Sequence, residues 1–245
     1  MDSTKSQETT CCPVVELRQY TLKPGQRDTL IALFEREFIE SQEALGMRII
    51  GTFRDLEKPD WFVWLRGFRD MESRAVQLQE FYGGPIWKAH REAANATMTD
   101  SDNVLLLRPA TPGSGFSIAH ASRAARDAAE NPAGLIVATL YHLESTTEAD
   151  FADYFQTIVA PALTAIANPI LGSFITEHHE NTFPGLPVRE DANVFIRFSR
   201  FPDRTAYGQK AARAADEIGT RLAGRIKGEP EVLFLTPTAR SLLGA

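Results

Sequence analysis

Short stretches of alternating apolar and polar residues are interspersed along the chain with segments whose apolar residues recur at helical spacing. Val14–Tyr20 is rich in β-branched residues and ends near the turn sequence Lys23–Gly25, so it predicts a strand. Arg27–Leu45 has apolar residues at helical spacing and stops at Gly46, which predicts a helix. The pattern then predicts two strands, a second helical segment and a last strand, at Gly51–Phe53, Trp61–Phe68, Met71–Met98 and Val104–Pro109.

The second half of the chain repeats this pattern at a nearly constant offset. Leu135–Tyr141 matches the first strand and Gly172–Phe174 the second, both at an offset of 121 residues. The offset rises to 133 at the third strand, so 12 extra residues fall around His178–Asp191, where we expect a hairpin extension. At the last strand, Val232–Pro237, the offset is 128. Such self-similarity indicates two diverged copies of one unit, fused head to tail.

The predicted order of elements in each copy is strand, helix, strand, strand, helix, strand, which is the ferredoxin-like order. The predicted fold class is therefore α+β, with two ferredoxin-like repeats that form an intrachain dimeric α+β barrel. A sheet with helices on one face must bury its other face, and the second copy supplies the partner, so we expect a ligand cavity between the sheets. The expected divisions are a disordered tail (1–12), repeat 1 (13–110), a linker (111–134) with a short helix at 122–130, repeat 2 (135–238) and a C-terminal tail (239–245).

Composition narrows the classes of function. The formal net charge of the 245 residues is −6, and no block of basic residues occurs, so we expect no nucleic-acid partner. The apolar runs are too short to span a bilayer, and the polar N-terminus does not have the pattern of a secretory signal. Cys11 and Cys12 are adjacent, and because vicinal disulfides are strained, we expect two free thiols and a cytoplasmic location.

The first copy resembles a known family. The sequence Glu16–Gly25 is similar to the opening strand and turn of NIPSNAP-family domains, and Gly51–Phe53, Trp61–Phe68 and Trp87 also fit. The resemblance covers Val14–Pro109, whereas the second copy fits weakly because it lacks the Glu-Leu-Arg and Lys-Pro-Gly elements. It implies a dimeric α+β barrel, whose relatives include small monooxygenases, dehalogenating or isomerising enzymes and haem-degrading proteins.

Strand alternation brings polar residues of the first copy onto one face. Glu16, Arg18 and Tyr20 share a face of the first strand, and Trp64 and Arg66 share a face of the third strand. We expect the opposite, apolar faces to meet the helices, so that these five side chains line the barrel cavity. Two interpretations stay open: a core ion pair between glutamate and arginine, or guanidiniums that recognise an anionic or carbonyl-bearing ligand.

The second helical segment adds two candidates. Trp87 and His90 share a helical face and could close the cavity, with the histidine as an acid or base; the alternative is that the tryptophan packs in the core and the histidine is half exposed. Gly83–Pro85 is expected to interrupt the helix. The adjacent pair His178 and His179 does not have the spacing of a metal site, so no metal and no cofactor are expected.

The polar set belongs to the first copy. At the offsets above, Glu16 corresponds to Val137 and Arg66 to Ser199, whereas Tyr20 corresponds to another tyrosine, Tyr141. We therefore expect one differentiated pocket that binds a small apolar or aromatic ligand, in a cofactor-independent monooxygenase-like or isomerase-like enzyme. The alternative is a non-enzymatic binding or assembly module, and a homo-oligomer stays open in either case.

Overall fold

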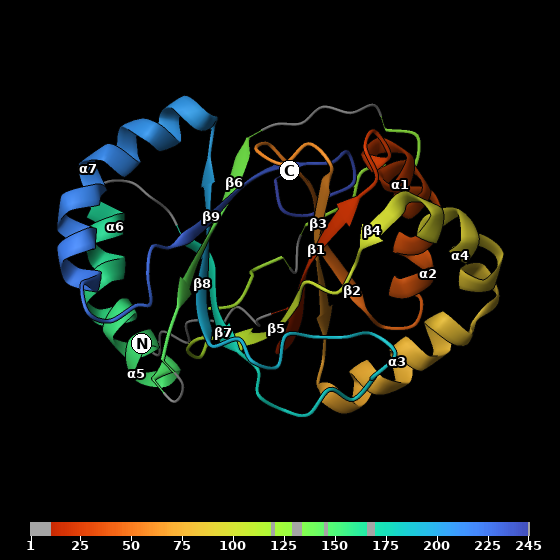
Figure 1. Ribbon diagram of the computed structural model, residues 1–245, viewed down its shortest axis with the longest axis horizontal. Coiled ribbons are helices and arrows are strands. Elements are labelled where there is room, and N and C mark those ends of the chain that lie inside the picture. Colours follow the sequence, from red (N-terminus) through yellow and green to blue (C-terminus); the bar gives the residue numbers. More distant parts are fainter. Residues whose placement is uncertain (1–10, 119–120, 129–133, 145–146, 166–169, 245) are drawn as a thin grey trace, which may run out of the picture.

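The computed structural model describes residues 11–118, 121–128, 134–144, 147–165 and 170–244. Eight of its strands form a closed antiparallel barrel, in the order β3-β2-β9-β6-β8-β7-β5-β1, and a pairing between β1 and β3 completes the ring. Helices cover the outside in two groups, α1 to α4 against one side and α5 to α7 against the other (Figure 1).

The two halves have a similar order of elements, except that the first half has two helices, α3 and α4, where the second has one, and has the additional short strand β4. In the first half these are β1 (Val14–Leu22), α1 (Arg27–Leu33), η1 (Phe34–Phe38), α2 (Ile39–Glu43), β2 (Arg48–Asp55), β3 (Trp61–Phe68), α3 (Met71–Gly83), α4 (Pro85–Thr97), β4 (Met98–Asp100) and β5 (Val104–Pro109). In the second they are β6 (Leu135–His142), α5 (Glu148–Tyr154), η2 (Phe155–Val159), α6 (Ala160–Ala165), β7 (Ile170–Thr176), β8 (Val194–Phe201), α7 (Arg204–Leu222) and β9 (Glu231–Pro237).

The strands of the two halves are also arranged alike. Leaving aside the short β4, which pairs with β1 outside the ring, each half runs last-first-third-second across its sheet, as β5-β1-β3-β2 and β9-β6-β8-β7. The halves join where β2 pairs with β9 and where β5 pairs with β7. In each half a single π-helical turn, η1 or η2, lies within the first helical segment.

The barrel interior is apolar, which overturns the expected orientation of the sheet. Val15, Leu17 and Leu65 belong to the buried cluster that also contains Ile136, Phe198 and Leu235 from the second half. The opposite face, with Tyr20 and Trp64, packs against α1, η1, α3 and α4. An eight-stranded barrel has an interior that side chains just fill, and apolar side chains fill it without needing hydrogen-bond partners. The expected ligand cavity between the sheets is therefore wrong.

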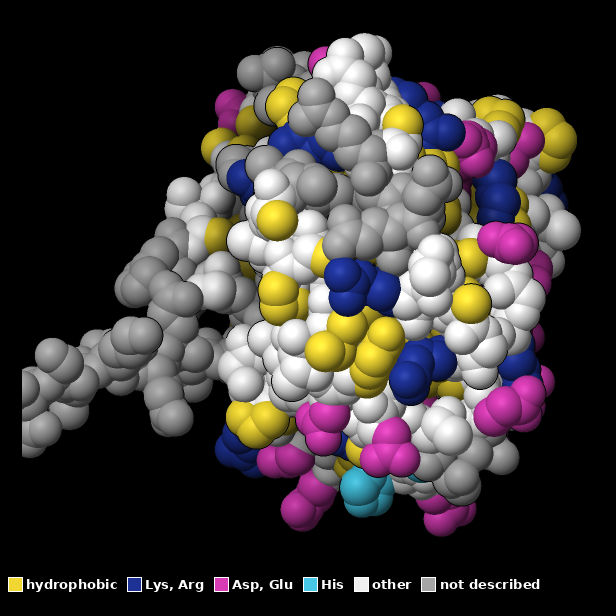
Figure 2. Space-filling model, turned by 90° about the vertical axis from the view of Figure 1, so that its left-hand side faces the viewer, with side chains coloured by type: hydrophobic (Ala, Val, Ile, Leu, Met, Phe, Trp, Pro, Cys, Tyr) yellow, Lys and Arg dark blue, Asp and Glu magenta, His cyan; other side chains and the backbone are white. Residues whose placement is uncertain are grey.

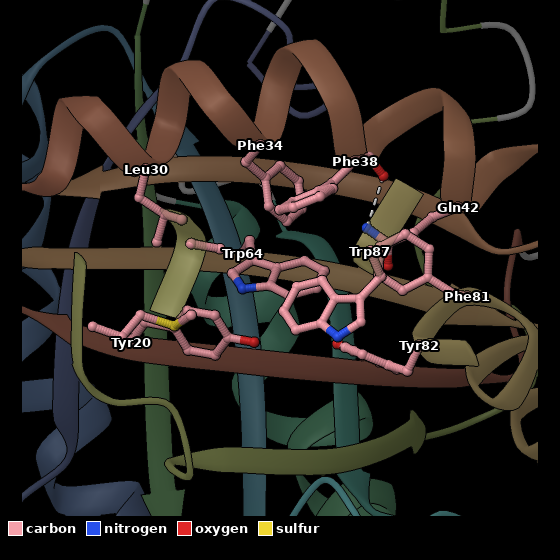
Figure 3. Close-up of a pocket in the computed structure, with 11 residues that line it drawn as sticks. Tyr20, Leu30, Phe34, Phe38, Gln42, Trp64, Phe81, Tyr82 and Trp87 are labelled. Carbon is pink, nitrogen blue, oxygen red and sulfur yellow. Dashed lines mark hydrogen bonds between the residues drawn. The ribbon is translucent and has the colours of Figure 1, made fainter. Parts of the chain in front are cut away.

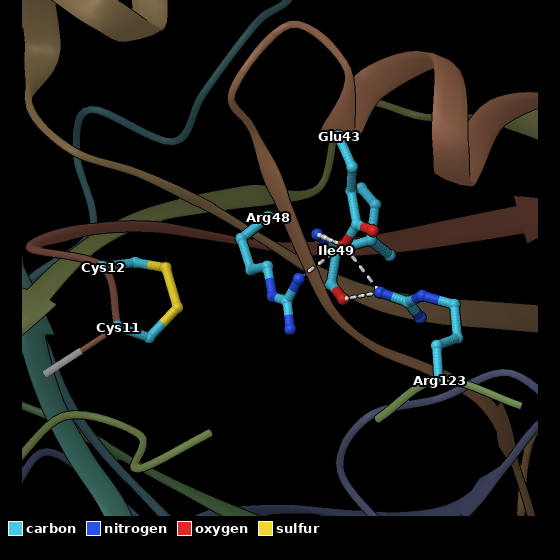
Figure 4. Close-up of a disulfide and its surroundings, with 6 residues drawn as sticks. All are labelled: Cys11, Cys12, Glu43, Arg48, Ile49 and Arg123. Atoms are coloured by element: carbon cyan, nitrogen blue, oxygen red, sulfur yellow. Dashed lines mark hydrogen bonds and ion pairs between the residues drawn. A yellow bond between two sulfur atoms is a disulfide. The ribbon is translucent and has the colours of Figure 1, made fainter. Parts of the chain in front are cut away.

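Three local expectations also need correction. Residues 121–128 form a turn without a helix, and the insertion 177–193 is an irregular segment without a hairpin ladder. The sulfurs of Cys11 and Cys12 are bonded to each other, so the expected free thiols are wrong and the cytoplasmic location loses that support (Figure 4). Of the expected N-terminal tail, residues 1–10 lie outside the described part, whereas Cys12 is buried.

Two segments outside the repeats tie the halves together at one end of the barrel. In the linker, Arg123 donates to the Glu43 carboxylate at 2.7 Å and to the Ile49 carbonyl at 2.6 Å (Figure 4). At the C-terminal end, Leu242 and Leu243 are buried in the cluster that fills the barrel. The expected tail 239–245 is therefore packed onto the barrel over its described residues.

Candidate functional site

Glu16 is the centre of a buried ionic cluster between the first sheet and its helices. Its Oε2 accepts hydrogen bonds from Arg18 Nη1 at 3.0 Å and from Arg66 Nε and Nη2 at 3.0 and 2.6 Å. Its Oε1 accepts from Arg74 Nε at 2.8 Å. All four side chains are fully buried. The expected pair of Glu16 with Arg18 is thus present, within a larger cluster.

Local structure explains why these groups meet. Glu16 and Arg18 lie two residues apart on β1, and β1 pairs with β3 so that Glu16 is opposite Arg66 and Arg18 is opposite Trp64. Side chains that are directly opposite on one face of an antiparallel pair are in reach of each other. Strand register therefore places both arginines of the sheet around the carboxylate.

Arg74 is a cluster member that the sequence analysis missed. It lies in the first turn of α3, where Asp70 caps the helix by accepting from the Ser73 N–H at 2.6 Å. Its Nη1 also donates to Asn181 Oδ1 and Thr182 Oγ1, at 3.0 and 3.2 Å, in the insertion between β7 and β8. A signal was available, because Arg74 shares a helical face with the buried Leu78 and Phe81.

The cluster has more positive than negative charge. Among the described residues, the three guanidiniums share one carboxylate partner, so the group has a formal charge of +2. Burial alone would raise the pKa of Glu16, but the attraction of Arg66, Arg18 and Arg74 outweighs it and holds that pKa well below its usual range. Burial opposes the charge on Arg74 and lowers its pKa. A buried positive excess of this kind favours an additional anion nearby.

An aromatic pocket lies beside the cluster. Tyr20 and Trp64 form its floor on the sheet, and side chains from the helices close it above, with Phe34, Phe38, Gln42, Phe81, Tyr82 and Trp87 among them (Figure 3). The enclosed space is about 30 Å³, room for about one water molecule. The pocket is nearly filled by its own side chains.

Arg18 connects the cluster to this pocket. Its Nε donates to the hydroxyl of Tyr20 at 2.9 Å, and its guanidinium lies 5.4 and 5.6 Å from the ring centres of Tyr20 and Trp64. Arg18 Nη2 and Trp64 Nε1 are buried donors that lack a hydrogen-bond partner in the described structure. Burial raises the pKa of Tyr20, so its hydroxyl stays protonated at neutral pH. Unpaired buried donors are costly, and they mark a place where an acceptor would be stabilised.

The two candidate residues of the second helical segment, Trp87 and His90, lie in different surroundings. Trp87 lines the pocket and packs against Phe38, Phe81 and Tyr82, with ring centres 4.9 to 5.9 Å apart. His90 is partly exposed and does not line the pocket; its Nε2 lies 3.6 Å from a carboxylate oxygen of Glu37. The helix ends at Gly83 and restarts at Pro85, as expected. The structure thus brings together every candidate except His90, on the helix-covered face of the sheet.

Among the described residues there is neither a candidate metal site nor a candidate membrane span. No group of three or more His, Cys, Asp or Glu side chains lies close enough together there to hold a metal ion. His178 pairs with Glu148 at 2.9 Å and His179 with Glu177 at 2.6 Å, so the adjacent histidines turn to different partners. No helix in this part of the chain combines the length and apolar character that a bilayer crossing requires.

Solved structures similar to this chain share its fold. A "putative monooxygenase" from Fusobacterium nucleatum superposes with a TM-score of 0.60 at 10% identity over 96% of both chains. A second "putative monooxygenase", from Lactobacillus acidophilus, gives 0.58 at 13% identity over 94% of this chain and 97% of that one. An anthrone oxidase-like protein gives 0.53 at 14% identity over 95% of each. At these identities the likeness establishes the α+β barrel fold alone.

Sequence comparison finds a family match for the first half of the chain. No curated protein matches the chain. The NIPSNAP family model matches residues 15–112, which span β1 to β5, the ionic cluster's Glu16, Arg18, Arg66 and Arg74, and the aromatic pocket. The resemblance seen in the sequence is therefore confirmed for the first half of the chain, where residues 15–112 match the NIPSNAP family model.

Proposed function

We propose that the first half of the chain binds a small aromatic molecule in its anionic oxygen form, as an enolate or phenolate, in the pocket over Tyr20 and Trp64. The observation that carries this proposal is the buried charge of +2 beside an aromatic-walled pocket, with Arg18 Nη2 and Trp64 Nε1 unpaired in the described structure. An anionic oxygen would offset the excess charge and accept from these donors.

The surrounding side chains support an aromatic ligand. The ring of Phe34 meets those of Phe38 and Trp64 edge-on, so a flat molecule would find ring faces and edges on several sides. Because the closed pocket holds about 30 Å³, binding requires side chains to move. Tyr82 and Trp87 flank the break at Gly83–Pro85, and we propose that their displacement admits the ligand.

The arrangement favours reactions that pass through an enolate. The guanidiniums lower the cost of removing a proton from a carbon that is next to a carbonyl or conjugated with it, and water takes that proton. Return of a proton at a different carbon gives an isomerisation.

In a monooxygenase-like reaction, the carbanion adds O₂ and a proton to give a hydroperoxide. Loss of water then leaves a ketone, so that CH₂ and O₂ become C=O and H₂O without a cofactor. The likeness in fold to proteins named for oxidation of this kind is consistent with this class.

Calorimetric titration with 1-naphthol and with naphthalene tests the binding step. We expect 1-naphthol to bind at least tenfold more tightly than naphthalene, and Arg18→Met to remove that preference, since a hydrogen bond to a charged group contributes roughly 1.5–3 kcal/mol. Arg18→Met leaves Glu16 with two arginines, and circular dichroism checks its folding. Arg108→Met, an exposed arginine on the adjoining β5, is the matched control and should bind like the wild type.

The same titration can refute the proposal. Equal affinity for 1-naphthol and naphthalene, or an unchanged preference in Arg18→Met, would show that the cluster does not recognise the oxygen. If Arg18→Met does not fold, Tyr20→Phe retains the ring and removes the hydroxyl, and it should weaken 1-naphthol binding while naphthalene binding is unchanged.

Turnover separates an enzyme from a binding module. With anthrone as the probe, oxygen uptake in a Clark electrode should exceed the uncatalysed rate and fall in Arg18→Met. A non-enzymatic binding module is the second candidate, favoured by how completely the pocket's own side chains fill it. Binding of 1-naphthol without oxygen uptake or isomerisation would select that candidate.

We also propose that the halves are two ferredoxin-like repeats, 13–110 and 135–238, joined by the linker 111–134. The similar element order and the shared last-first-third-second strand order support this interpretation.

A further inference from the structure

The second half contains a large cavity of its own. It lies between the sheet strands β6, β8 and β9 and the helix α7, in the position that the aromatic pocket has in the first half. Its volume is about 610 Å³, within the range of small-molecule sites. Most of the wall is apolar, with Ile218, Leu222, Ile226 and Val232 among its residues.

One buried cation lies in this wall. The side chain of Arg197 on β8 is 7% exposed, donating from Nε to the hydroxyl of Tyr141 at 3.1 Å and from Nη1 to Ser199 Oγ at 2.9 Å. Both partners are neutral, and no carboxylate pairs with Arg197 among the described residues. A buried guanidinium without a counter-charge is costly, and an anion in the cavity would relieve that cost.

Two neighbouring hydroxyls converge on the same place. Thr139 is directly opposite Arg197 in the pairing of β6 with β8, and Tyr141 lies two residues further along the same face. Thr139 Oγ1 is buried without a hydrogen-bond partner in the described structure. A cation and an unpaired hydroxyl therefore lie at the floor of a mostly apolar cavity, whose lining also includes Glu229.

Comparison with the first half shows why this site is different. The tyrosine hydroxyl accepts from an arginine Nε in both halves, from Arg18 at 2.9 Å and from Arg197 at 3.1 Å. In the second half Val137 stands at the position of Glu16, and within the described part of the chain Arg197 has no carboxylate partner. Arg197 itself stands at the position of Trp64, the large ring that forms the floor of the first pocket.

We propose that this cavity is a second binding site, for a monocarboxylate with an apolar body, whose carboxylate binds Arg197 and whose body lies against α7. A guanidinium matches a carboxylate with two parallel hydrogen bonds, and the apolar wall accommodates the rest of the molecule. On the face that carries α7, hydrophobic and basic side chains lie beside one another at the centre, and many acidic side chains lie toward the rim (Figure 2). That distribution suits the approach of an amphipathic anion.

Calorimetric titration with octanoate, 1-octanol and acetate tests the site. We expect octanoate to bind at least tenfold more tightly than 1-octanol, which lacks the charge, and than acetate, which lacks the apolar body. Arg197→Gln should weaken octanoate binding at least tenfold, whereas Arg200→Gln, at an exposed position on the same strand, should not change it.

A second pair of variants keeps the test independent of Arg197. Gly219 on α7 lines the cavity, and a Cβ there meets no atom within 4 Å, so a leucine at this position is expected to extend into the cavity space. Gly208→Leu on the same helix is equally unhindered and lies outside the cavity lining. Gly219→Leu should weaken octanoate binding and Gly208→Leu should not. Equal binding of octanoate and 1-octanol, or wild-type affinity in either Arg197→Gln or Gly219→Leu, would overturn the proposal.

Discussion

Replacing Glu16 by glutamine tests the ionic cluster most sharply. The side chain keeps its shape, but the fully buried Arg18, Arg66 and Arg74 lose their one shared carboxylate, and the formal charge of the cluster rises from +2 to +3. Removing one member of a buried ion pair costs roughly 3–5 kcal/mol, because the remaining charge stays desolvated. For a chain of this size each kcal/mol lowers Tm by about 2–4 °C, so Tm should fall by about 6–20 °C.

The pH dependence provides a second measurement on the same variant. The pKa of Glu16 is lower in the folded protein than in the unfolded chain, where about 4.3 is ordinary. Its stabilising contribution is therefore complete above the unfolded pKa and is lost as the pH falls toward the folded pKa. The stability difference between wild type and Glu16→Gln should be constant between about pH 5 and pH 8 and should narrow below about pH 4.

Urea denaturation at several pH values, followed by circular dichroism, measures this difference. Glu57→Gln is the matched control, because Glu57 forms an exposed ion pair with Arg204 at 2.6 Å, and such pairs contribute about 1 kcal/mol or less. A loss of under about 1 kcal/mol in Glu16→Gln at pH 7, or a difference that grows in acid, would refute the assignment of a buried, ionised glutamate.

Three further predictions follow from other parts of the structure. Leu65→Ala, in the barrel interior, should lower the free energy of unfolding in urea by about 2–5 kcal/mol; a loss below about 1 kcal/mol would contradict an apolar, filled barrel. Arg123→Ala removes the hydrogen bonds from the linker to Glu43 and Ile49, and should cost about 1–3 kcal/mol by the same measurement; an unchanged midpoint would show that the linker does not hold the barrel end. The difference in 295 nm absorbance between wild type and Tyr20→Phe should titrate above pH 10, about the ordinary tyrosine pKa, since burial raises the pKa of Tyr20; a midpoint at or below pH 10 would contradict its burial.

The order of elements could be predicted from the sequence, because the repeated alternation and helical spacing are local signals. The sequence also showed which side chains share a face, and Glu16, Arg18 and Tyr20 do lie together. It could not show which face is inside the barrel. Both faces of these strands are buried, so alternation between polar and apolar residues did not distinguish the interior from the helix-covered side.

Long-range contacts account for the remaining differences. Arg74 joins the cluster from α3, and Asn181 and Thr182 reach it from the insertion in the second half. Helical spacing shows that Arg74 faces the core, but the partners that it meets depend on how helices and insertions pack onto the sheet. The second cavity was missed for a related reason. Val137 stands where the first half has Glu16, and the lack of a carboxylate partner for Arg197 among the described residues is visible only when the neighbours of Arg197 are known.

A crystal structure of the protein with 1-naphthol would show whether the aromatic pocket is the binding site. We expect density for the naphthol ring over Tyr20 and Trp64, with its oxygen within hydrogen-bonding distance of Arg18 or Trp64 Nε1 and with Trp87 displaced. Density for 1-naphthol only elsewhere, or an unchanged pocket at saturating 1-naphthol, would contradict this expectation.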